Sequence, residues 1–155
     1  RSASIFHSSR LEEAKIFTIA KGVFGYSFTK DSERLFLRTE CVRSGRVCEL
    51  YSVEVENPAA TVKKVAGRIH TYEPDPIDES VLMVTYARVD GDALDLGVAP
   101  ADGSAGAIML DRMVIPGTKI LGGTVPRIAY AVLERDRMGI YVADVPAFEQ
   151  AEAAP

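Results

Sequence analysis

The sequence predicts an α+β domain of two β-β-β-β-α repeats related by a pseudo-twofold axis, with antiparallel sheets packed against helices. Three observations support this class. Short runs of β-branched and aromatic residues recur in both halves of the 155-residue chain. Each half then changes to an apolar spacing of three and four residues, which is typical of a helix. Both halves also contain a similar phrase, Thr61-Val-Lys-Lys-Val-Ala66 and Thr124-Val-Pro-Arg-Ile-Ala129.

Four strands are expected in the first half, because residues 15–20, 23–29, 34–41 and 46–55 are rich in aromatic and β-branched types or alternate in polarity. A helix is expected next. Asn57 is a candidate N-cap and Pro58 suits the first helical turn. The apolar positions that would share one helical face are Val62, Val65, Ala66 and Ile69.

The second half repeats this order. Strands are expected over residues 80–89, 93–99, 107–115 and 119–121, followed by a helix from Thr124 towards Gly139. The helical face would be formed by Val125, Ile128, Ala129 and Val132. Residues 140–143 fit either a short closing strand or an extension of that helix.

Length and composition predict one globular domain over residues 14–143, with repeats at 14–72 and 78–139, an N-terminal arm at 1–13 and a C-terminal tail at 144–155. Apolar runs stay well short of the roughly 18 residues that a membrane-spanning helix needs, so no membrane partner is expected. Two cysteines and two histidines are too few for a structural zinc site without carboxylates, and no metal or cofactor is expected. A disulfide between Cys41 and Cys48 is left open.

Charge divides the chain. Residues 14–71 carry ten Lys/Arg and six Asp/Glu, whereas the rest of the chain beyond them carries six and fourteen. The first half is therefore basic within a chain whose net charge is −4.

The chain resembles the Whirly family of single-stranded nucleic-acid-binding proteins. The similarity lies in Lys21-Gly22 after the first expected strand, in Thr29-Lys-Asp31, and in Arg127-Ile-Ala-Tyr-Ala-Val-Leu133, which is similar to the opening of the family's last helix. Within the fold, trypanosomatid mitochondrial RNA-binding proteins are the nearest resemblance. It implies a mitochondrial protein that binds guide RNA and assists annealing in RNA editing. Because an acidic chain repels RNA at long range, we expect this protein to work in a homo- or hetero-oligomer with a more basic partner.

An RNA strand lying across a sheet requires cations along the strands and aromatic side chains where bases stack. Phe24 and Phe28 are expected in the core, and Tyr26 is a candidate for stacking because its hydroxyl favours contact with water. The expected RNA contacts are Lys15, Lys21, Lys30, Arg34, Arg38, Arg43, Arg46 and Tyr26.

Two other classes fit the residues. The first is a self-assembling structural β-domain, such as a coat or decoration subunit, with residues 1–10 as an arm that grips a neighbour. The second is a β-rich protein that binds a small ligand. Catalysis is not expected, since the segment from Asp102 to Gly106 is best explained as a polar loop, and His70 as a residue at a helix end.

Overall fold

The computed structural model describes residues 3–6, 16–42, 44–76, 79–88, 92–121 and 124–148, and it corrects the fold class. Within these residues the chain is all β, apart from one short 3-10 turn, so the expected α+β class with packed helices is wrong. The elements are β1 (Ala3–Phe6), β2 (Ile16–Ala20), β3 (Val23–Phe28), β4 (Arg34–Val42), β5 (Val47–Glu54), β6 (Lys63–Pro74), β7 (Val81–Ala87), β8 (Leu94–Pro100), β9 (Ile108–Val114), β10 (Lys119–Leu121), β11 (Arg127–Val132), η1 (Arg135–Arg137) and β12 (Gly139–Asp144).

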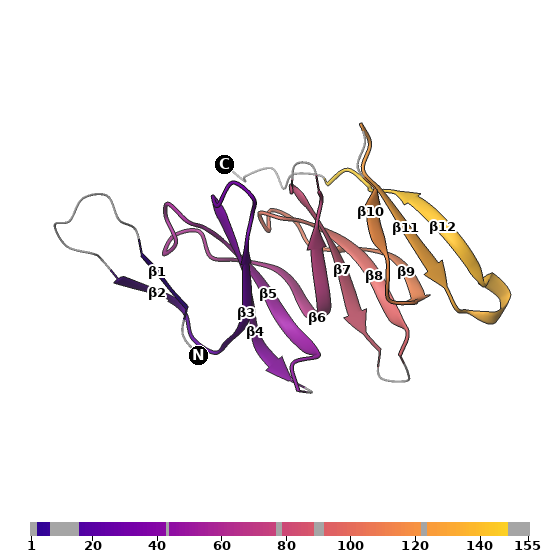
Figure 1. The fold of residues 1–155 in the computed structure, drawn as a ribbon, viewed down its shortest axis with the longest axis horizontal. Helices are drawn as coiled ribbons and strands as arrows, with labels where there is room; N and C mark the ends of the chain where they lie inside the picture. Colours follow the sequence, from indigo (N-terminus) through magenta and orange to yellow (C-terminus); the bar gives the residue numbers. More distant parts are fainter. Residues whose placement is uncertain are drawn as a thin grey trace, which may run out of the picture.

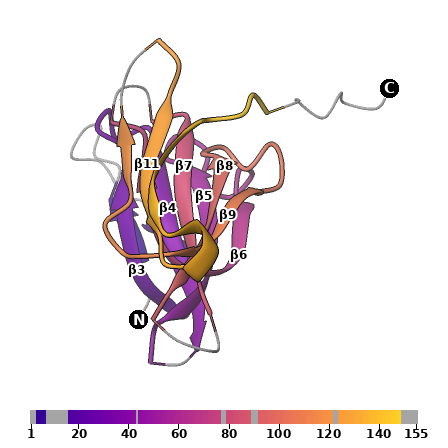
Figure 2. The same cartoon turned by 90° about the vertical axis from the view of Figure 1, so that its right-hand side faces the viewer.

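The strands form an antiparallel meander in which sequence neighbours are mostly spatial neighbours. β1 pairs with β2 in a separate two-stranded sheet, and β3 to β9 follow one another in the main sheet. At the other end β11 pairs with β9, β10 and β12. Figure 1 shows the strands following one another along the long axis from β3 to β12, and Figure 2 looks along that axis from the β12 end.

The core consists of three clusters that use both faces of the sheet. On β4, Leu35 and Leu37 belong to one cluster and Phe36, between them, to another. On β7, Leu82 belongs to the same cluster as Phe36, whereas Met83 belongs to a third. Successive side chains of a strand point to opposite faces, so β4 and β7 are buried on both sides. The curved sheet therefore covers itself and needs no helical layer.

The first expected helix is wrong, because its residues form strand β6. Irregular pairing of this strand explains why its apolar residues have the spacing of a helix. The register shifts between Cys48 and Leu50 and again between Ile69 and Thr71, and Arg68 has a φ of 60°. Such bulges interrupt the alternation of a strand, and here the buried positions fall at a helix-like spacing. Before β6, the amide of Ala60 and the hydroxyl of Thr61 donate to the Asn57 carbonyl in a turn, not in a helix.

The second expected helix is also wrong. Its residues form β11, the turn η1 and β12, and buried Ile128, Tyr130 and Val132 alternate with more exposed neighbours at the spacing of a strand. Residues 140–143 lie in β12, so the closing strand was the correct alternative for them. The two β-β-β-β-α repeats and their pseudo-twofold axis do not exist in this fold. Val125 and Ala129 complete a helical spacing with Ile128 and Val132 by chance, and this spacing produced the wrong prediction.

Arg68→Gly is expected to raise the free energy of unfolding by roughly 0.5–1 kcal/mol. A left-handed conformation costs a side-chain-bearing residue about 1–2 kcal/mol, and glycine avoids most of that cost. The Arg68 amide keeps its bond to the Glu49 carboxylate. Urea denaturation measures the effect. Thr71→Gly, at an exposed position of the same strand, is the control and should destabilise by up to about 1 kcal/mol. If both variants destabilise to a similar extent, the left-handed conformation of Arg68 is contradicted.

Candidate interaction surfaces at the ends of the sheet

The expected RNA-contacting residues do not form one basic face. Lys15 and Arg43 lie outside the described residues. Lys21 and Arg46 are exposed. Lys30 is exposed as well, but its amide donates to the Glu79 carboxylate and its ammonium to the Pro76 carbonyl.

Arg34 is half-buried and is held by two side chains of β5. Its Nη1 donates to Ser52 Oγ at 2.9 Å, and its Nη2 lies 3.4 Å from a carboxylate oxygen of Glu54. A cavity of about 630 Å³ opens beside it. Six carboxylates line that cavity: Asp31, Glu33, Glu54, Glu56, Glu79 and Asp102. A phosphate approaching Arg34 would therefore meet a negative field.

Two of these carboxylates, Asp31 and Asp102, accept hydrogen bonds from neighbouring residues. Donation from the Thr29 hydroxyl and from the Glu33 amide holds the pKa of Asp31 below its usual range. Burial raises the pKa of Asp102, but hydrogen bonds from Ser104 outweigh it and the net shift is downward. In the part of the chain that the structure describes, no group of three or more His, Cys, Asp or Glu side chains could hold a metal ion. The cavity is an acidic hollow, not a metal centre.

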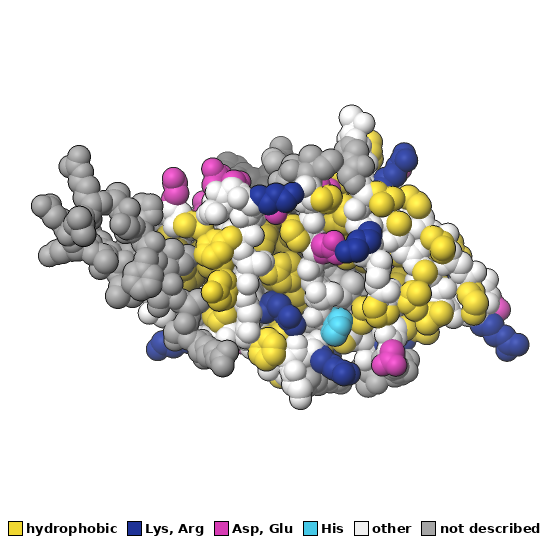
Figure 3. All heavy atoms as spheres, in the orientation of Figure 1, with side chains coloured by type: hydrophobic (Ala, Val, Ile, Leu, Met, Phe, Trp, Pro, Cys, Tyr) yellow, Lys and Arg dark blue, Asp and Glu magenta, His cyan; other side chains and the backbone are white. Residues whose placement is uncertain are grey.

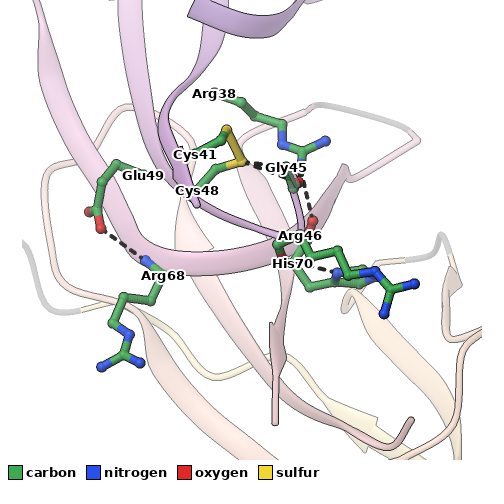
Figure 4. Close-up of a disulfide and its surroundings, with 8 residues drawn as sticks. All are labelled: Arg38, Cys41, Gly45, Arg46, Cys48, Glu49, Arg68 and His70. Carbon is green, nitrogen blue, oxygen red and sulfur yellow. Dashed lines mark hydrogen bonds between the residues drawn. A yellow bond between two sulfur atoms is a disulfide. The ribbon is translucent and has the colours of Figure 1, made fainter. Parts of the chain in front are cut away.

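Arg38 ties three segments together (Figure 4). Its Nη2 donates to the carbonyls of Gly45 and His70 at 2.8 and 3.2 Å and to Cys48 Sγ at 3.3 Å. Its guanidinium also lies over the Phe24 ring, 5.7 Å from the centroid, which adds a cation–π attraction. Arg38 is thus a structural residue of the β4–β5 hairpin and is not free for phosphate.

Cys41 and Cys48 form a disulfide that closes the β4–β5 hairpin (Figure 4). At the turn, Gly45 has a φ of 85°, and a side chain there would meet the Phe24 ring at 2.2 Å from its Cβ. Only glycine meets both conditions.

His70, expected at the end of a helix, lies in β6 with Nδ1 3.1 Å from the Arg46 carbonyl oxygen.

The aromatic side chains of β3 form the first candidate surface. Phe24, Tyr26 and Phe28 are 60%, 64% and 44% exposed, so the expectation that both phenylalanines are buried is wrong. The cause is topology: β3 is the last strand of the main sheet, and among the described strands it pairs with β4 alone. Tyr26 and Phe28 contact edge to face, with centroids 6.1 Å apart.

A groove of about 410 Å³ runs beside these rings. Tyr26 and Phe28 line it together with Tyr72 and Pro74 of β6. Ser27 and Tyr72 share a hydrogen bond of 2.6 Å between their hydroxyls, which fixes the floor of the groove. The Tyr72 ring packs against Phe36 of the core at 5.7 Å, so the groove has one rigid wall.

The second candidate surface lies at the opposite end and was missed by the sequence analysis. We call it the outer face: the side of β10, β11 and β12 that points away from the core. Figure 3 shows hydrophobic side chains gathered over this end of the molecule. Cross-strand register places Ala129 beside Val142 and Ala131 beside Ile140. The apolar members of the outer face are Leu121, Ala129, Ala131, Ile140 and Val142.

The sequence did not predict the outer face, because β12 is apolar on both sides. Tyr141 and Ala143 pack on the core, whereas Ile140 and Val142 are 84% and 59% exposed. A strand that is apolar on both faces reads from sequence as a buried strand. The composition was therefore the signal, but only the topology shows that one face is uncovered.

An ion pair between exposed Arg137 and buried Asp111 anchors the turn that leads into β12. Arg137 donates to both Asp111 oxygens at 2.8 and 2.6 Å, and its carbonyl accepts a hydrogen bond from the Tyr141 hydroxyl at 2.7 Å. Burial raises the pKa of Asp111, but donation from Arg137, from the Arg112 amide and from Tyr130 outweighs it and lowers the pKa overall. β12 is therefore held in place although it is an end strand.

Comparison with protein-family models and with curated proteins finds no match. No helix in the described part of the chain is long and apolar enough to span a membrane. Functional inference rests on the two exposed ends of the sheet.

Replacing both cysteines by serine is expected to lower the free energy of unfolding by ~2–3 kcal/mol, because the disulfide restricts the unfolded chain over a short loop. Urea denaturation with and without a reductant checks this. The reductant should destabilise the native protein by the same amount and leave the Cys41→Ser/Cys48→Ser variant unchanged. Equal stability of native protein and variant without reductant would contradict a stabilising role.

Proposed function

We propose that the protein is a self-assembling structural β-domain without catalytic activity, which associates through the exposed ends of its sheet. The observation that carries the proposal is the outer face, whose exposed Leu121, Ile140 and Val142 lie on three strands and are bordered by exposed Lys119, Arg127 and Asp144. Contiguous apolar patches of several hundred Å² on a protein surface mark interaction sites. The small side chains of Ala129 and Ala131 leave room for a second layer or strand to approach closely.

The magnitudes are adequate for association. Burying an isoleucine or valine side chain contributes about 1.5–3 kcal/mol, whereas association costs on the order of 4–15 kcal/mol in lost freedom. A single side chain cannot offset that cost. The outer face offers Ile140, Val142 and Leu121, and exposed Leu133 and Met138 lie at its margin, so a contact over the whole face can.

Ile140→Lys is expected to weaken self-association by at least ~10-fold, because it removes an apolar contact and places a charge in the contact. Sedimentation velocity over a range of protein concentrations measures the effect. The matched control is Val62→Lys, at an exposed valine that precedes β6 and lies outside both candidate surfaces. A wild-type protein that stays monomeric at every concentration would overturn the proposal.

A second candidate, single-stranded RNA binding, is favoured by one observation: three exposed aromatic side chains on β3, flanked by exposed Lys21 and Arg46. Stacking of bases on aromatic rings is tolerant of sequence and common in single-strand binders. The internal bonds of Arg34 and Arg38 and the acidic cavity weaken this candidate. Guide RNA as the ligand, annealing, a mitochondrial location and a more basic partner stay predictions.

If RNA stacks on β3, Tyr26→Ala should reduce affinity for a fluorescent oligouridylate by roughly 5- to 150-fold, the equivalent of about 1–3 kcal/mol per stacked base. Fluorescence anisotropy measures this, and affinity should also fall as salt rises. Arg135→Ala, at an exposed cation in η1 at the opposite end, is the control and should leave affinity unchanged. Absence of binding at low salt would rule out this second candidate.

A further inference from the structure

We infer that the protein assembles head to tail, with the end strand β3 of one copy pairing with the end strand β12 of the next, so that one sheet continues from molecule to molecule. The inference rests on the proposed function and names its partner, a second copy of this chain. It also makes the two candidate surfaces, at opposite ends of the molecule, neighbours in one continuous sheet.

Both strands offer unpaired backbone groups. Among the described strands, β3 pairs with β4 alone and β12 with β11 alone. Each strand is six residues long, so the two edges match in length. Natural proteins protect exposed edges with proline, lysines, inward charges or β-bulges. Neither Val23–Phe28 nor Gly139–Asp144 contains a proline or a lysine. The register of β3 with β4 shifts between Val23 and Gly25 and is regular from Gly25 to Phe28, so the regular part of β3 is the part that another strand can extend.

The side chains on the two edges are complementary. Tyr26 and Phe28 are exposed at alternate positions of β3, and Ile140 and Val142 at alternate positions of β12. Pairing of these edges in an antiparallel register that sets Tyr26 beside Val142 and Phe28 beside Ile140 forms two cross-strand pairs of an aromatic with a β-branched residue. Such pairs are among the favourable contacts of antiparallel sheets.

Charge does not select between the possible pairings. Exposed Lys21 and Lys30 flank β3, but exposed Asp31 and Glu33 follow Lys30. Exposed Asp136 precedes β12 and exposed Asp144 ends it, but Arg127 pairs with Asp144 and Arg137 with Glu134. The preference for unlike edges therefore rests on the aromatic and β-branched side chains.

A contact between two different surfaces has a defined consequence for assembly. Each molecule keeps one free edge of each kind after it binds a neighbour, so growth continues until a ring closes or a filament forms. A twofold dimer, which joins identical surfaces, stops at two. This difference makes the inference testable separately from the proposed function.

The test uses two variants of the full chain, each with one edge blocked. The first is Tyr26→Lys/Phe28→Lys, which leaves β12 intact, and the second is Ile140→Lys/Val142→Lys, which leaves β3 intact. All four side chains are exposed, so folding should be preserved, and circular dichroism with urea denaturation verifies it. Val62→Lys serves again as the control that assembles like the wild type.

Sedimentation velocity should show wild-type species that grow with concentration, each blocked variant alone as a monomer, and an equimolar mixture of the two variants as a dimer that grows no further. Wild-type assembly with a mixture that stays monomeric, or with a blocked variant that still associates like the wild type, would overturn the head-to-tail inference and leave the proposed function standing. A wild type that stays monomeric would overturn both.

Discussion

The structure depends on one constraint: a sheet without helices must bury its own apolar side chains. β4 and β7 meet this constraint because they are apolar on both faces, and each contributes to two of the three core clusters. The irregular strand β6 lies between them in the sheet, and its register shifts allow the sheet to change direction. A sheet that covers itself in this way still has ends, and the ends are where apolar side chains remain exposed.

The sequence predicted most of the strands. It also predicted two helices, and both of these segments are strands in the structure. Strands expected over residues 34–41, 46–55 and 93–99 correspond closely to β4, β5 and β8, because alternation and β-branched content report directly on a pleated strand. The spacing of Val65, Ala66 and Ile69 is instead the product of bulges. A bulge breaks the period of two because one strand carries an extra residue, and its position is defined only by the pairing with the neighbouring strands.

The candidate surfaces could be predicted only in part. Tyr26 was correctly considered for an exposed position, whereas Phe24 and Phe28 were assigned to the core on the general tendency of large apolar residues. Whether a strand is central or terminal follows from the pairing order of the whole sheet, which no local window contains. The partners of the expected cations could not be predicted for a related reason. Arg34 and Arg38 stand on the strands as expected, but Ser52, Glu54 and Gly45, which engage them, belong to β5 and the turn before it.

The Cys41–Cys48 disulfide has a consequence for where the protein can work. The bond joins the strand that borders β3 to the next one, and the carbonyl of Gly45 within the same loop receives Arg38, whose guanidinium lies over the Phe24 ring. Disulfides persist in oxidising compartments and are rare where thiols are kept reduced. The geometry of the aromatic edge is therefore linked to the redox state of its surroundings, and a reducing environment would loosen the hairpin on which that edge is supported.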